Sequence, residues 1–123
     1  MRELKTVHHE IDVLVGKIFT KVEGDAEEGE MVFANEDRYF KFVHIQECCE
    51  GVFIEDVVGE LEWLTNTPIL SATETSDDDP DHSCGYGIWT FYNFATIKGH
   101  VTIRWYGLSN GYYSVAVQLI ELI

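Results

Sequence analysis

One stretch near the C-terminus constrains the fold more than any other part of the chain. Residues 91–114 read FYNFATIKGHVTIRWYGLSNGYYS and contain no Asp or Glu, although the 123-residue chain carries a formal charge of −14. The stretch is crowded with aromatic residues, which are enriched in β-strands. We therefore expect three aromatic-rich strands at residues 86–95, 99–106 and 112–122.

The side chains of the first two strands select their register, because a slip of one residue would move every side chain to the opposite face. Pairing Ala95 with His100 across a four-residue loop places Phe94 opposite Val101 on the core face. Partner Cβ atoms on one face of such a pair lie about 5 Å apart, so these side chains should touch.

The second hairpin has two possible registers. The Asn110–Gly111 pair suggests a two-residue turn, but that turn mixes apolar and polar partners on both faces. A five-residue loop keeps the faces separate. It pairs Tyr106 with Tyr112 and sets Arg104 opposite Ser114, so we adopt this register.

Together the two registers gather a candidate ligand-binding face on the side of the strands that points away from the core. Its aromatic rings could stack on a base, and its arginine offers a planar fork for a phosphate. Packing against a helix or a partner subunit would also account for such a face. The residues are Trp89, Phe91, Asn93, Thr102, Arg104, Tyr106, Tyr112 and Ser114.

The charge is unevenly distributed along the chain. Residues 1–85 hold 6 Lys or Arg and 21 Asp or Glu, whereas residues 86–123 hold Lys98 and Arg104 against Glu121 alone. So acidic a chain does not suit DNA, RNA or an anionic membrane, for which basic surfaces supply most of the affinity. An acid on the candidate face would repel phosphate, which would explain the acid-free stretch.

Length and hydropathy indicate one domain, over residues 1–123. No run approaches the roughly 18 apolar residues of a membrane span. The polar N-terminus resembles neither a signal peptide nor a transit peptide, so we expect a cytoplasmic protein.

Two segments show apolar residues spaced three or four apart, which predicts an N-terminal helix and a central helix. The remaining short apolar runs predict strands. The expected fold is α+β: an antiparallel β-sheet domain, β-sandwich-like, with these two helices. The two stripes are Leu4, Val7, Ile11 and Leu14, and Ile54, Val57, Val58, Leu61 and Leu64.

Catalytic and metal-binding patterns are weak. The possible soft-metal ligands lack the paired spacing of zinc sites, and the odd number of cysteines does not suggest a disulfide framework. We therefore expect reduced cysteines, no metal, no cofactor and no catalytic centre. The residues considered are His44, Cys48, Cys49, His82 and Cys84.

Two blocks of the sequence resemble a known phage family. They are FKFVHIQECCEGVFIEDVVGELEWLTNTPILSATE and WTFYNFATIKGHVTIRWYGLSNGYYS, and the likeness extends over residues 38–114. The chain is similar to the first-described anti-Thoeris proteins. Within the second block the resemblance adds Ser109 and Asn110 to the candidate ligand-binding residues.

The resemblance implies a non-enzymatic sponge that binds glyco-cyclic ADP-ribose, a signal of the Thoeris immune system, without degrading it. It also implies a homo-oligomer built from dimers, such as a hexamer, with cyclic trinucleotides of CBASS immunity as further ligands, in the cytoplasm of an infected bacterium. Two alternatives remain open: an interaction module that binds a host protein, and a hydrolase that degrades the signal.

Overall fold

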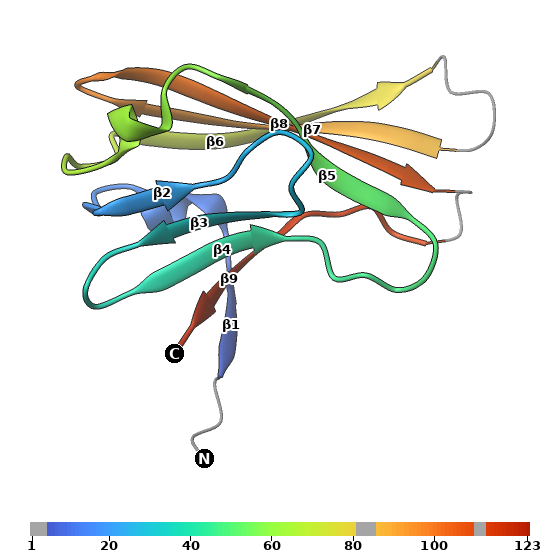
Figure 1. Ribbon diagram of the computed structural model, residues 1–123, viewed down its shortest axis with the longest axis horizontal. Coiled ribbons are helices and arrows are strands. Elements are labelled where there is room, and N and C mark those ends of the chain that lie inside the picture. The colour runs from blue at the N-terminus through green and yellow to red at the C-terminus, as the bar shows by residue number, and fades with distance from the viewer. Residues whose placement is uncertain (1–4, 81–85, 110–112) are drawn as a thin grey trace.

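The structure is a computed structural model that describes residues 5–80, 86–109 and 113–123. Its strands form two antiparallel sheets that pack face to face (Figure 1). The five-stranded sheet has the order β1 (Thr6–His9), β9 (Gln118–Leu122), β4 (Tyr39–Val43), β3 (Glu30–Ala34) and β2 (Lys21–Glu23). The four-stranded sheet has the order β5 (Gly51–Val58), β8 (Gly99–Ser109), β7 (Tyr86–Thr96) and β6 (Ser71–Asp79).

The α+β prediction with two helices is wrong. The structure is 57% strand, and none of the described residues belongs to a helix of seven residues or more. Both expected helices are replaced by a strand and a four-residue 3-10 turn, η1 (Ile11–Leu14) in the first case and η2 (Leu61–Leu64) in the second. None of the described helices is long and apolar enough to cross a membrane.

A β-bulge explains why the second stripe looked helical. Strand β5 pairs with β8 through Ile54 opposite Trp105 and Asp56 opposite Arg104, which leaves Glu55 as an extra residue. A bulge puts two residues of one strand opposite a single partner residue. Ile54 and Val57 therefore both face the core three positions apart, which is the spacing of a helix face.

The register of β7 with β8 is confirmed, including Ala95 opposite His100 and Phe94 opposite Val101. The register of the second hairpin is wrong. The other neighbour of β8 is β5, and the last strand, β9, lies between β1 and β4 in the opposite sheet (Figure 1). The chain after β8 crosses from one sheet to the other instead of turning back beside it.

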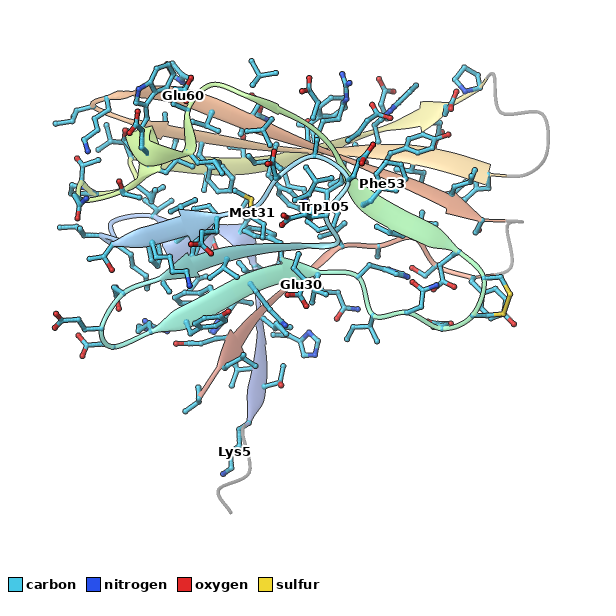
Figure 2. The ribbon with its side chains drawn as sticks, viewed as in Figure 1. Lys5, Glu30, Met31, Phe53, Glu60 and Trp105 are labelled. Atoms are coloured by element: carbon cyan, nitrogen blue, oxygen red, sulfur yellow. A yellow bond between two sulfur atoms is a disulfide. The ribbon has the colours of Figure 1, made fainter. Side chains whose placement is uncertain are left out.

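An aromatic layer joins the two sheets. Phe33 contacts Phe94 with ring centroids 5.1 Å apart, and Phe42 contacts Tyr92 at 4.6 Å. All four side chains are almost completely buried. Figure 2 shows Met31 and Trp105 in the same layer between the sheets.

The crossing segment packs tightly on β8 and supplies a first prediction. A Cβ added at Gly107 would lie 2.5 Å from the Cβ of Val115. Gly107→Ala should therefore lower the free energy of unfolding by about 1–3 kcal/mol, the usual cost of overpacking a filled core. Gly51→Ala is the matched control, because a Cβ there would meet no atom within 4 Å. Equal urea-unfolding midpoints for the two variants would contradict this packing.

Candidate functional site

The side of the four-stranded sheet that faces away from the core carries most of the predicted ligand-binding residues, and we call it the outer face. Strand alternation buries Tyr92 and Phe94 of β7 and leaves the odd-numbered residues on the other side. The outer face gathers Phe53, Glu55, Asp56, Asp77, Asp79, Trp89, Phe91, Asn93, Thr102, Arg104 and Tyr106.

Four predicted residues fall elsewhere or cannot be placed. Ser109 is buried at the end of β8, where its hydroxyl donates to the carbonyl oxygen of Tyr113 at 3.0 Å. Ser114 accepts a hydrogen bond from the backbone N–H of Ala116 in the crossing segment and is not opposite Arg104. Asn110 and Tyr112 lie outside the described residues.

The bulge in β5 gives Arg104 two acidic neighbours that the sequence did not suggest. The Arg104 Nε lies 2.7 Å from an oxygen of Glu55, and its Nη2 lies 3.9 Å from an oxygen of Asp56. The prediction that Ser114 lies opposite Arg104 is therefore wrong, because Asp56 of β5 takes that position. The helix expected over residues 54–64 would not place these acids beside Arg104. A β-bulge also gives such a pattern, in which two acids lie between two apolar residues that face the core.

Three aromatic rings form a row across the outer face. Phe53 contacts Tyr106 with centroids 6.1 Å apart, and Tyr106 contacts Trp89 at 5.5 Å. Trp89 also donates its indole N–H to Glu55 at 3.2 Å. The row is half-buried and therefore still presents ring surface to a binding partner.

A tyrosine–aspartate hydrogen bond closes one end of this row. The Tyr106 hydroxyl donates to Asp79 at 2.6 Å, and its oxygen lies where a Cβ on Gly87 would come within 2.5 Å. Glycine at this position therefore lets the ring lie across β7. The hydrogen bond to Asp79, with help from burial, raises the pKa of Tyr106 to about 12.

The outer face is acidic as well as aromatic. Glu55, Asp56, Asp77 and Asp79 come from the outer strands β5 and β6, and Arg104 is the only Lys or Arg on the described strand residues of this face. The expectation of an acid-free face is therefore wrong. Only the two central strands of this sheet, β7 and β8, contain no Asp or Glu.

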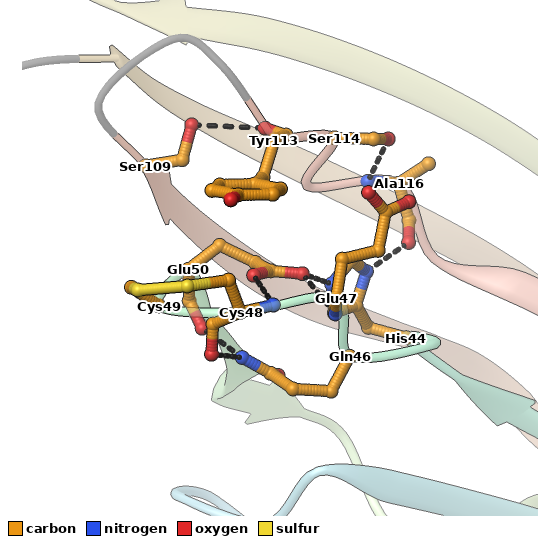
Figure 3. A network of polar contacts seen from close by, with 10 residues as sticks. All are labelled: His44, Gln46, Glu47, Cys48, Cys49, Glu50, Ser109, Tyr113, Ser114 and Ala116. Atoms are coloured by element: carbon orange, nitrogen blue, oxygen red, sulfur yellow. Dashed lines mark hydrogen bonds and ion pairs between the residues drawn. A yellow bond between two sulfur atoms is a disulfide. The ribbon is translucent and has the colours of Figure 1, made fainter.

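The HIQECCE segment folds into a loop around the buried carboxylate of Glu50 (Figure 3). Glu50 accepts hydrogen bonds from the backbone N–H groups of Glu47 and Cys48, both at 2.8 Å, and lies 2.7 Å from the His44 Nε2. Gln46 donates from its side chain to two carbonyl oxygens of the same loop.

His44 ties this loop to the crossing segment. Its Nδ1 lies 2.7 Å from the carbonyl oxygen of Ala116 (Figure 3). The first of the two blocks that carry the family resemblance thus contacts the segment that follows the second block.

The cysteines differ from the expectation. Cys48 and Cys49 form a disulfide between adjacent residues, so they are not reduced. His82 and Cys84 lie outside the described residues. Among residues 5–80, 86–109 and 113–123, no three His, Cys, Asp or Glu side chains are grouped as a metal site would require.

A second buried carboxylate, that of Glu121, lies on strand β9 of the five-stranded sheet. Arg38 donates to both of its oxygens, at 2.6 and 2.8 Å, and His9 lies 2.8 Å away. The Arg38 hydrogen bond is the largest influence on the pKa of Glu121, which falls to about 2. This group ties β1 and the residue that precedes β4 to β9.

Glu50 generates a prediction about acid stability. Burial by itself would raise the pKa of Glu50, but the hydrogen bonds from His44 and the loop backbone outweigh it and lower the pKa to about 2. A carboxyl group with a lowered pKa stabilises the fold above its ordinary pKa of 4.5, and this stabilisation is lost as the pH falls towards 2.

Glu50→Gln should therefore flatten the fall of stability between pH 4.5 and 2 and lower stability at neutral pH. Urea unfolding across this range measures the effect. Glu47→Gln is the control, since Glu47 is exposed in the same loop. An unchanged slope in Glu50→Gln would show that the carboxylate does not hold the loop.

Comparison with known proteins identifies a family without assigning an activity. A model described as a domain of unknown function, DUF7448, matches residues 12–119. No curated protein and no solved structure matches the chain significantly, so the likeness to anti-Thoeris proteins stays a prediction. The match spans most of the chain, from η1 to the start of β9, so the chain belongs to the DUF7448 family.

Proposed function

We propose that this protein is a non-catalytic binding module that docks a basic segment of a partner protein on its outer face. One observation carries the proposal: a row of half-buried aromatic rings is flanked by four carboxylates, and the single arginine among them is already paired. Such a face attracts cations and repels phosphates.

The chemistry of the face suits lysine and arginine side chains. A cation over the face of Trp or Tyr gains about 0.5–1 kcal/mol at an exposed site and more when water is excluded. Trp89 and Tyr106 offer such rings with Glu55 and Asp79 at their edges. The formal charge of −14 would further steer a basic partner towards the protein.

The acidic pair on the bulge provides the direct test. Glu55→Gln combined with Asp56→Asn should weaken binding of a Lys- and Arg-rich peptide at least about fivefold, or about 1 kcal/mol. Glu36→Gln with Asp37→Asn removes the same two charges from an exposed turn and is the matched control. Calorimetry measures the affinity of both variants for the peptide. Equal weakening would mean that net charge alone attracts the peptide, and the proposal would fail.

A second candidate function is the sequestration of a cyclic ADP-ribose-type nucleotide by a homo-oligomer. The resemblance over residues 38–114 and the stacking surface of Trp89 and Phe91 favour it. For Arg104 to clamp a pyrophosphate, it would first have to leave Glu55 and Asp56. Incubation with cyclic nucleotides, denaturation and mass spectrometry would test it: intact ligand recovered from the protein supports sequestration, and none recovered excludes it.

Arg104→Ala separates the two candidates, because they predict opposite results. Removing a cation from an acidic face should tighten binding of the basic peptide. Removing a phosphate clamp should weaken nucleotide binding at least about tenfold. The fold should lose no more than about 1 kcal/mol, because the ion pair is partly exposed. Titration of both ligands against this one variant measures the outcome.

A further inference from the structure

Strand β6 forms an open edge of the four-stranded sheet. Along one side it pairs with β7 over all nine of its residues, and none of the described strands pairs with its other side. In an antiparallel pair, the backbone N–H and C=O groups of every second residue point away from the neighbouring strand. Among the described residues, no backbone–backbone hydrogen bond other than those of this pairing involves residues 73–78. The open side of β6 can therefore pair with a further strand.

The other sheet edges are short or covered, as edges in proteins usually are. Strands β1 and β2 have four and three residues. Strand β5 is interrupted by its bulge, and the loop before β3 covers its edge. The Glu27 N–H donates to the Ile54 carbonyl oxygen at 2.6 Å, and the Ile54 N–H donates to the Glu28 carbonyl oxygen at 2.7 Å. By contrast, β6 keeps an unbroken register over nine residues, and none of the described loops hydrogen-bonds to the backbone of residues 73–78.

The side chains of β6 select what can pair with it. Residues 73–78 are all exposed, and the strand reads SATETSDDD, with four acids and no base. A second copy of β6 in the adjacent position would line the four carboxylates of each chain along one seam, where like charges repel. A strand rich in lysine or arginine would instead place opposite charges beside each other. Charge therefore disfavours a second copy of this chain and favours a basic strand.

We propose that the basic partner segment binds along β6 in an extended conformation and adds a strand to the four-stranded sheet. The inference rests on the proposed function, because it specifies how the same segment is held. Main-chain hydrogen bonds to a sheet edge supply affinity, and alternate side chains of the added strand supply specificity. One set of these side chains points to the outer face, where Asp77 lies opposite Trp89 of the aromatic row.

The probe is an acetylated and amidated peptide with the nine-residue length of β6, in which lysine alternates with threonine. Two further versions carry backbone N-methyl groups, one on every lysine and the other on every threonine. Each version loses the N–H donors along one edge of the extended peptide and keeps every charge. Calorimetry should show that the version methylated on the edge facing β6 binds at least about tenfold more weakly than the unmethylated peptide, and that the other binds about as well. Equal affinities of all three peptides would overturn the inference.

Hydrogen exchange measured by NMR locates the added strand on the protein. Saturating peptide should slow the exchange of alternate amide N–H groups along residues 73–78, because these groups face the open edge and gain acceptors. Docking on the outer face alone would leave these exchange rates unchanged, and that result would contradict strand addition.

Charge variants on β6 test the choice of a basic strand. Asp77→Asn combined with Asp78→Asn should weaken the unmethylated peptide at least about fivefold. Glu36→Gln combined with Asp37→Asn removes as many charges from an exposed turn and should not. If both pairs weaken the peptide alike, the overall charge attracts it and the acids of β6 do not select it.

The outcomes separate this inference from the proposed function. If the unmethylated peptide does not bind, both fail. If it binds and depends on Glu55 and Asp56 but tolerates both patterns of methylation, only the inference about β6 fails, because the segment then lies on the outer face without joining the sheet.

Discussion

The structure depends on the aromatic layer that joins the two sheets. Phe33, Phe42, Tyr92 and Phe94 interlock with centroid separations of 4.6 to 6.1 Å, and burial of such large side chains is the main favourable contribution to folding of a domain this size. Because Tyr92 and Phe94 must point inward, the pleat of β7 sends its odd-numbered residues outward. The aromatic row of the outer face follows in part from this one constraint, because it leaves Trp89 on the outward side of β7.

Local patterns predicted the part of the fold in which sequence neighbours pair. Strands β7 and β8 are joined by a tight turn, so the apolar pattern of each fixes the other and the register could be derived side chain by side chain. The same reasoning gave the wrong neighbour for the other side of β8. The partner of β8 is β5, about fifty residues earlier in the chain, and nothing within residues 99–122 indicates that an earlier strand would take that place. The final strand instead completes the other sheet, where it brings Glu121 to Arg38.

The candidate site follows the same division between local and distant pairing. The sequence located Trp89, Phe91, Arg104 and Tyr106 on one face, and the structure brings them together. It could not supply the chemistry of that face, because Glu55 and Asp56 arrive through a bulge that imitates helical spacing. The extra residue places two carboxylates opposite one arginine. The two central strands alone predict a face that binds an anion through Arg104. With the acids of β5 and β6 beside them, the same face is an acidic surface.

The acid-free stretch has a physical explanation in this arrangement. Residues 91–109 form most of the two central strands. Their inward side chains are largely buried, and two of their outward ones, Arg104 and Tyr106, contact carboxylates from β5 and β6. An acid at position 104 would face Asp56 of β5, and one at position 89 would face Asp77 of β6, across about 5 Å, where like charges repel. Aromatic and hydroxyl groups avoid that repulsion and donate to the flanking acids, as Trp89 does to Glu55 and Tyr106 to Asp79. At these positions the lack of acids therefore matches the acids of the neighbouring strands.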